Sequence, residues 1–215
     1  MQQRRLPPMP PADRRRAIAV ALAAVAVTCT TAFAPPGATG ASAFDLEALT
    51  ALLATVRSGE ATFVETRRIE MLDRTLTSSG RLTFKAPDVF VRETLKPRRE
   101  RLAVDGNTLT MSIGERSRTL QLDASPEAAV IVEAIRGTLT GNRAALERLF
   151  ETRVGGDAAA WTLELVPRDL RLRGQVASVR VSGRESAVRE VRVLLADGDH
   201  SVMTIEPVAP GRGAS

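Results

Sequence analysis

Between residues 61 and 122, apolar and polar side chains alternate with a period close to two, and turn residues interrupt the alternation repeatedly. Such alternation is typical of β-strands that bury one face. It predicts six strands, at residues 61–72, 77–85, 89–95, 101–104, 108–113 and 117–122. The turn signals between them are Ser78-Ser79-Gly80, Ala86-Pro87-Asp88, Asp105-Gly106-Asn107 and Gly114-Glu115. Because such short connections join antiparallel neighbours, this pattern favours an antiparallel sheet.

Three segments have helical spacing instead. The first covers residues 45–57 and ends before Gly59. The second begins at Ser125, the expected N-cap, with Pro126 at the first helical position. The third covers residues 143–150, after Asn142 as its cap. The apolar faces of the first two are Leu46, Leu49, Leu53 and Val56, and Val130, Ile131, Ala134 and Ile135.

Strand patterns return after the helices, and the element order defines the fold class. The later strands are predicted at residues 161–166, 176–181, 188–195 and 201–205, with hairpins at Gly183-Arg184-Glu185 and Asp197-Gly198-Asp199. Strands and helices do not alternate singly, which disfavours a parallel nucleotide-binding sheet. We therefore expect an α+β fold: a curled antiparallel sheet of about ten strands, forming an open, incomplete barrel, with helices over its concave apolar face. Such a shape encloses an apolar space suited to a hydrophobic ligand or peptide.

The first 43 residues have the three parts of a secretory signal peptide. Five arginines lie in the first sixteen residues, an Ala/Val-rich run follows at residues 17–27, and a small-residue stretch ends at Ala43. The run is too short for an ordinary membrane-spanning helix. Cleavage after Ala43 leaves 25 basic and 24 acidic residues, so most of the net charge of +5 belongs to the export signal. We expect a periplasmic protein with a domain at residues 44–208 and a disordered tail at 209–215.

Three other interpretations of this segment remain open. Ala32-Phe33-Ala34 is an alternative processing site, Cys29 is a candidate lipidated cysteine, and Arg15-Arg16 is a candidate twin-arginine signal. Thr28 fits lipoprotein processing poorly, and Ala17-Ile18 continues a twin-arginine motif weakly. After cleavage at Ala43 the mature chain has no cysteine, so export brings no disulfide.

The sequence offers little for catalysis. It has one cysteine and one histidine, and it contains neither a Gly-x-Ser-x-Gly elbow nor a phosphate-binding glycine-rich loop. Asp197, Asp199 and His200 suggest a metal or acid–base site, but Asp-Gly is also ordinary chemistry for a tight turn, which we favour. A hydrolase would need His200 in the cavity beside a carboxylate and a hydroxyl. We expect no enzyme activity, no cofactor and no metal.

One basic stretch and one aromatic residue each allow two interpretations. Residues 96–101 contain four basic side chains that suit phosphate or an anionic lipid headgroup, but a solvated strand edge is favoured. Because aromatic residues are not interleaved with the basic ones, nucleic-acid binding is not expected. Trp161 fits a pocket wall or the core, and its spacing alone favours the core.

Six motifs in order resemble the LolA family, the periplasmic carriers of outer-membrane lipoproteins. The segment from Ser79 to Phe90 is similar to the family's Gly-x-Leu…Pro-x-x-Phe motif, and Leu102 to Leu109 is similar to its Asp-Gly hairpin. The other similar segments are Thr62-Phe63-Val64-Glu65, Pro97, Trp161 to Pro167, and Val188 to Pro207. The resemblance covers nearly all of residues 44–208. It implies an open barrel-like sheet with a cavity for acyl chains, and no enzyme activity or cofactor.

The chain departs from this family at two positions. The arginine that precedes the motif proline and holds the helical lid closed is replaced by Ala86, so Lys85 and Arg92 are the candidate substitutes. The aromatic residue after the motif Phe90 is also absent. Both departures indicate a divergent LolA-related branch whose cargo is a lipoprotein, a glycolipid or another envelope lipid.

Ten apolar residues are our candidates for the walls of the cavity, and each of them also fits the ordinary core. They are Phe63, Leu82, Phe84, Phe90, Ile135, Leu139, Trp161, Leu163, Val193 and Met203. The partners implied by the resemblance are the lipid or lipoprotein cargo, an inner-membrane exporter and an outer-membrane receptor, with the protein a monomer. The alternative function is that of an accessory module docked to a membrane lipid exporter, with its cavity filled by side chains.

Overall fold

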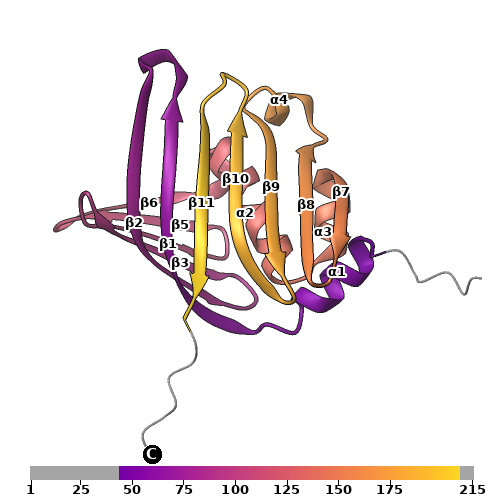
Figure 1. Cartoon of the computed structure of the whole chain (residues 1–215). Coiled ribbons are helices and arrows are strands. Elements are labelled where there is room, and N and C mark those ends of the chain that lie inside the picture. Colours follow the sequence, from indigo (N-terminus) through magenta and orange to yellow (C-terminus); the bar gives the residue numbers. More distant parts are fainter. Residues whose placement is uncertain (1–43, 209–215) are drawn as a thin grey trace, which may run out of the picture. The chain divides into compact units, whose positions relative to one another are not determined.

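The computed structural model describes residues 44–208, which form one antiparallel sheet of eleven strands (Figure 1). The strands before the central helices are β1 (Ser58–Ile69), β2 (Arg74–Lys85), β3 (Val89–Lys96), β4 (Glu100–Asp105), β5 (Thr108–Ile113) and β6 (Arg116–Gln121). Those after them are β7 (Phe150–Asp157), β8 (Ala160–Pro167), β9 (Val176–Arg184), β10 (Ala187–Leu195) and β11 (His200–Pro207). All ten predicted strands are present.

The spatial order is β6-β5-β4-β3-β2-β1-β11-β10-β9-β8-β7. Pairing of β1 with β11, from Ala61 opposite Pro207 to Arg68 opposite His200, joins the two halves of the sheet. Strands β6 and β7 are its two edges, so the sheet curls without closing. This is the predicted open, curled α+β sheet.

The first turn of the sheet lies elsewhere than predicted. Ser78, Ser79 and Gly80 lie inside β2, and the β1–β2 turn is the 3₁₀ segment Glu70–Leu72 followed by Asp73 in the left-handed region (φ +43°). Gly80 is needed for close packing, because a Cβ there would lie 1.8 Å from the carbonyl oxygen of Glu93 on β3. The predicted turn was therefore wrong: the glycine allows a close approach at a bulge in the β2–β3 ladder.

Strand β7 was not predicted. Its sequence places polar residues and two glycines where a central strand would carry β-branched ones, and only Phe150 in it is buried. Such a composition is tolerated because β7 is an edge strand that pairs only with β8. The predicted third helix accordingly ends one residue earlier, before Phe150 enters β7.

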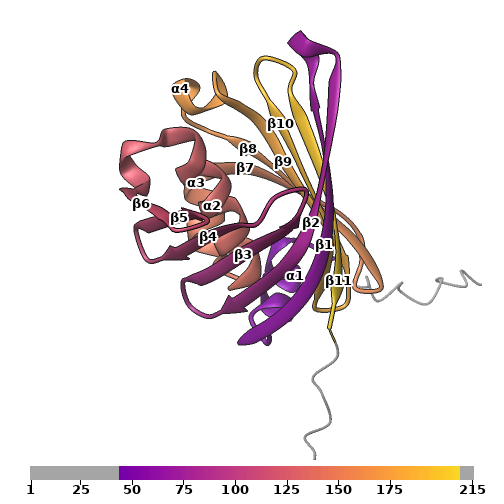
Figure 2. The ribbon, with the colours of Figure 1, turned by 90° about the vertical axis from the view of Figure 1, so that its left-hand side faces the viewer.

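Four α-helices accompany the sheet: α1 (Leu46–Leu53), α2 (Pro126–Leu139), α3 (Arg143–Leu149) and the unpredicted single turn α4 (Leu170–Arg173). Figure 2 shows α2 and α3 on the concave side, between the β3–β6 arm and the β7–β9 arm. Helix α1 also packs there, since it contacts α2, α3 and β7. It ends four residues earlier than predicted.

Two apolar clusters place α2 between the arms of the sheet. In the larger cluster, Val130 and Ala134 of α2 pack with the leucines of α1 and with Trp161, Leu163 and Val179 of β8 and β9. In the smaller one, Ala128, Ala129 and Val132 pack against Val104, Leu109 and Leu122. Helix α2 is therefore apolar on several sides, because it contacts both halves of the sheet.

The N-cap of α3 makes a testable contribution to stability. The Asn142 side chain accepts a hydrogen bond from the backbone nitrogen of Ala145 at 3.1 Å. We expect Asn142→Ala to lower the free energy of unfolding by about 1 kcal/mol in urea denaturation, because it removes this cap. Asn107→Ala, at an exposed turn, should change it by less than about 0.5 kcal/mol. Equal losses in both variants would contradict the capping role.

Candidate functional site

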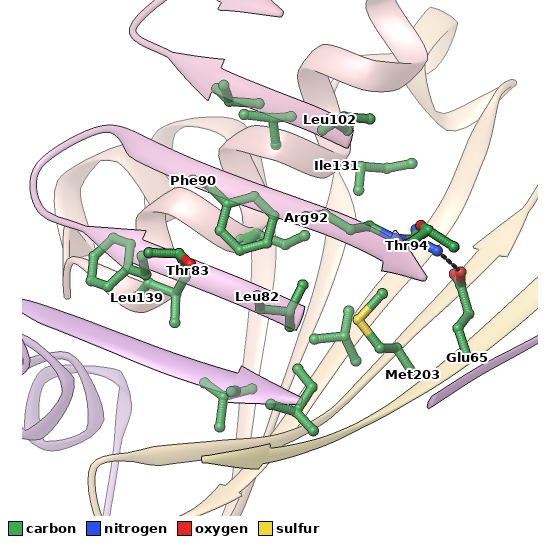
Figure 3. Close-up of a pocket in the computed structure, with 18 of the residues that line it drawn as sticks. Glu65, Leu82, Thr83, Phe90, Arg92, Thr94, Leu102, Ile131, Leu139 and Met203 are labelled. Atoms are coloured by element: carbon green, nitrogen blue, oxygen red, sulfur yellow. Dashed lines mark hydrogen bonds and ion pairs between the residues drawn. The ribbon is translucent and has the colours of Figure 1, made fainter. Parts of the chain in front are cut away.

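A cavity of 1570 Å³ lies between the two arms of the sheet, and α2 forms part of its wall (Figure 3). Strands β1–β5 and β9–β11, with residues of the connections beside them, supply the rest of the lining. Pockets for small molecules typically measure about 300–1,000 Å³. The cavity is therefore larger than one small ligand needs, and it has room for extended hydrocarbon chains.

One face of α2 lines this cavity. Ile131, Ile135 and Leu139 follow each other at intervals of four residues, so they project from the same side of the helix. All three are half-buried. Val130 and Ala134, by contrast, belong to the core beneath α1. The helix thus separates the packed core from the cavity.

The structure places seven of the ten predicted wall residues at the cavity. These are Leu82, Phe84, Phe90, Ile135, Leu139, Val193 and Met203. Phe63, Trp161 and Leu163 lie outside its lining, in the packed core, where each is at most 2% exposed. The indole nitrogen of Trp161 donates to the carbonyl oxygen of Glu185 at 2.8 Å, which holds the ring against Gly183.

Several wall residues were not named from the sequence. Among them are Ile131, Leu102, Val188 and Val191, which project into the cavity from α2, β4 and β10. Ile131 had been assigned to the apolar face of its helix, but spacing does not distinguish a face toward the core from a face toward a cavity. Once Ile135 and Leu139 are known to face the cavity, the spacing of four places Ile131 on the same side of the helix.

The cavity changes character along its length. At one end it is lined by Phe84, Phe90, Ile135, Leu139 and Ile205, which we call the apolar end. At the other, which we call the charged end, it is lined by Glu65, Arg67, Ser78, Arg92, Arg98 and Glu100. The register shows the separation, since Ala61 on β1 pairs with Leu82, and Glu65 pairs with Ser78. Four residues of strand separate these two levels by roughly 13 Å. The backbone of Arg92 lies at the first level, opposite Leu82, and its side chain extends to Glu65 and Ser78 at the second.

Arg92 is the central polar group of the charged end. Its Nη2 donates to Glu65 Oε2 at 2.5 Å (Figure 3). The same nitrogen donates to the Ser78 hydroxyl at 3.1 Å. Its guanidinium carbon lies 4.7 Å from the centre of the Phe63 ring, in a cation–π contact. The ion pair is mostly sheltered, with the Arg92 and Glu65 side chains 25% and 15% exposed. Arg92 therefore ties β3 to β1 and β2.

Neither proposed substitute for the lid arginine bonds to a helix in residues 44–208. Lys85 is exposed, and Arg92 bonds to Glu65 on β1 and to Ser78 on β2. An arginine of α2 makes such a link instead: Arg136 Nη2 donates a hydrogen bond to the carbonyl oxygen of Gly106 at 2.5 Å. Gly106 lies in the β4–β5 hairpin, so this contact links α2 to the arm across the cavity.

The His200 region forms the favoured turn. Gly198 has φ +96°, and Asp197 accepts a hydrogen bond from the backbone nitrogen of Asp199 at 3.0 Å. Asp199 accepts another from the backbone nitrogen of Glu70, which holds the β10–β11 turn against the β1–β2 turn. His200 lies at the rim, with Nδ1 3.8 Å from Glu70. Within residues 44–208, no three His, Cys, Asp or Glu side chains gather as a metal site would require.

A model of the outer membrane lipoprotein carrier protein LolA-like family matches residues 38–209 of this sequence. The chain belongs to this family. The match covers every element of the LolA-like fold described above, including both ends of the cavity. No curated protein matches the sequence. None of the helices in residues 44–208 is long and apolar enough to cross a bilayer.

Solved structures similar to this LolA-like chain include three from different bacteria. A DUF1329 family protein from Desulfovibrio piger is 12% identical, with a TM-score of 0.46, over 79% of this chain and 92% of the other. A LolA superfamily protein from Nitrosomonas europaea is 12% identical, with a TM-score of 0.41, over 75% and 89%. LprF from Mycobacterium bovis is 9% identical, with a TM-score of 0.36, over 79% and 96%.

Proposed function

We propose that this LolA-like protein binds the acyl chains of a lipoprotein or another envelope lipid and carries them through the periplasm toward the outer membrane. The observation that supports this most directly is the cavity of 1570 Å³ with its apolar end. Burial of each CH₂ group is worth about 0.8 kcal/mol, so acyl chains bind such a wall without specific polar contacts.

A carrier must also release its cargo, and the position of α2 suits that need. The helix forms a wall through Ile131, Ile135 and Leu139, and it is linked to the opposite arm by the Arg136 contact with Gly106. Movement of this helix would widen the cavity without breaking any strand pairing. We propose α2 as the lid, with no catalytic step and no cofactor involved.

The proposal extends to location and partners. The signal peptide predicted at residues 1–43 lies outside the described residues, and its removal after Ala43 would release the domain into the periplasm. Cargo would then be received from an inner-membrane exporter and delivered to an outer-membrane receptor, with the protein acting as a monomer. The second candidate function, an accessory module at a membrane exporter, requires only the surface of the domain and no ligand.

Native mass spectrometry of the protein from its own periplasm tests the proposal. We expect an added mass equal to a lipid or an acylated protein, and the loss of that mass in Phe90→Asp, because Phe90 lies in the wall at the apolar end. The variant's thermal unfolding should be measured in parallel, so that misfolding is recognised. An empty protein that also takes up no fluorescent fatty acid would contradict the carrier function and favour the accessory module.

A further inference from the structure

We propose that the headgroup of the ligand is anionic, a phosphate or a carboxylate, and that it binds at the charged end of the cavity beside Arg92. This inference rests on the proposed function, since it assumes that acyl chains occupy the apolar end. It adds the chemical class of the cargo and the direction in which the cargo lies.

The balance of charge supports an anion at this end. Antiparallel register places Arg92, Leu102, Met111 and Arg118 in one cross-strand row, and Thr94, Glu100, Ile113 and Arg116 in the next. Directly opposed residues share a face, so Arg116 and Arg118 lie on the concave face with Arg92. The charged side chains lining this end or lying on the face beside it are Arg67, Arg92, Arg98, Arg101, Arg116, Arg118, Glu65 and Glu100. Arg67, Arg92, Arg98 and Arg101 each pair with a carboxylate, from Asp199, Glu65, Glu100 and Glu93 respectively. Within residues 44–208, Arg116 and Arg118 form no ion pair with a carboxylate, so these two side chains supply the excess of positive charge beside the charged end.

At the rim of the apolar end, acidic side chains outnumber basic ones. The charged residues that line it are Glu60, Asp88, Glu127, Lys85 and Arg136, and Arg136 is already paired with Glu133. An amphiphile with a negative headgroup is therefore repelled at the apolar end and attracted at the charged end. The charge distribution supports one orientation of the ligand, with the chains toward Leu139 and the headgroup toward Arg92.

Arg92 also has hydrogen-bonding capacity to spare. A guanidinium offers five N–H donors in a planar fork that matches phosphate and carboxylate oxygens. Within residues 44–208, the Arg92 hydrogen bonds to Glu65 and Ser78 come from Nη2 alone, and its buried Nε has no acceptor. Because the group is largely shielded from solvent, an added charge-assisted hydrogen bond there would be stronger than at the surface.

Glu65 competes with the proposed headgroup for Arg92, and its removal therefore gives a second prediction. If the ion pair only stabilised the sheet, removing either partner would weaken ligand binding or leave it unchanged. If Arg92 binds an anionic headgroup, loss of Glu65 should strengthen binding of that headgroup, since a repelling carboxylate is removed and Nη2 becomes available. The two variants therefore have opposite expected effects.

The test measures binding of four amphiphiles with the same dodecyl chain by titration calorimetry below their critical micelle concentrations. The headgroups are phosphate, carboxylate, maltose and trimethylammonium, and inorganic phosphate is titrated separately. We expect dodecyl phosphate and dodecanoate to bind at least about tenfold more tightly than dodecyl maltoside, with the cationic amphiphile weakest. Inorganic phosphate alone should show no measurable binding, because its contribution depends on the attached chain.

The variants assign the effect to the charged end. Arg92→Gln should weaken dodecyl phosphate binding about tenfold more than it weakens dodecyl maltoside binding, whereas Glu65→Gln should strengthen dodecyl phosphate binding by about 3-fold or more. Arg153→Gln is the matched control, since that side chain is 82% exposed on β7 and lies outside the cavity lining. It should change neither affinity.

Four other outcomes are possible, and each would overturn a stated claim. Equal binding of all four amphiphiles would overturn the headgroup inference and leave the proposed lipid-binding function standing. Binding of none would overturn the proposed function itself. Tight binding of inorganic phosphate alone would indicate a site for a free anion and overturn the assignment to a lipid headgroup. A preference for anions that persists in Arg92→Gln would overturn the role of Arg92.

Discussion

Leu139→Asp should weaken acyl-chain binding by more than about 100-fold, measured as displacement of a fluorescent fatty acid. Leu139 lies in the α2 wall at the apolar end of the cavity. An acyl chain against this position would strip water from the new carboxylate without offering a hydrogen bond. Because the leucine is half-buried and not part of the closed core, the fold should tolerate the change better than the ligand does.

Leu170→Asp is the matched control for this variant. It makes the same chemical change at a leucine on α4 that is 78% exposed and outside the cavity lining. Its affinity for the fatty acid should equal that of the unmodified protein. If both variants bind normally while remaining folded, acyl chains do not occupy the apolar end.

Gly80→Ala should lower the free energy of unfolding by about 3 kcal/mol or more in urea denaturation. A Cβ at this position would lie 1.8 Å from the Glu93 carbonyl oxygen and 2.9 Å from the Thr94 Cα. Both are backbone atoms of β3, so the clash can be relieved only by moving one strand away from the other. That movement would disturb the side-chain contacts of Arg92 with Glu65 and Ser78.

Gly59→Ala provides the comparison, because it adds the same methyl group to a glycine of β1. No atom lies within 4 Å of a Cβ built there. Alanine should leave stability unchanged or raise it by about 0.5 kcal/mol, as expected when chain entropy alone changes. Similar losses in both variants would show that the close approach at Gly80 is not what requires glycine.

Local sequence patterns predicted most of this fold. A two-residue connection does form at the predicted Asp105-Gly106-Asn107 turn, where Gly106 and Asn107 join β4 to β5. Asn142 does cap α3, and the period of two did locate the ten predicted strands. In each case the signal lies in a few neighbouring residues, such as a glycine with φ +55° at position 106. Where the relevant contact is distant in sequence, prediction failed: Gly80 resembles a turn until β3 is seen lying against it.

The cavity also separates what local sequence patterns predict from what depends on contacts distant in sequence. Ile135 and Leu139, two of the predicted wall residues, line the cavity from one face of α2, which repeats about every four residues. Trp161 and Leu163 alternate along β8 in the same way as true wall residues, yet they face the helices α1–α3 and are buried in the core. Whether an inward apolar residue contacts a helix or open space depends on where the helices lie, which a strand's own sequence does not encode.

By itself, the sequence determined the element types, the antiparallel connections and the family, because these depend on side-chain period, turn chemistry and motif order. Only the tertiary structure decided that Arg92 on β3 meets Glu65 on β1, and that the cavity has an apolar end and a charged end. The physical reason is that both features depend on register across several strands. That register is set by the packing of the whole curled sheet around α2, to which residues distant in sequence contribute together.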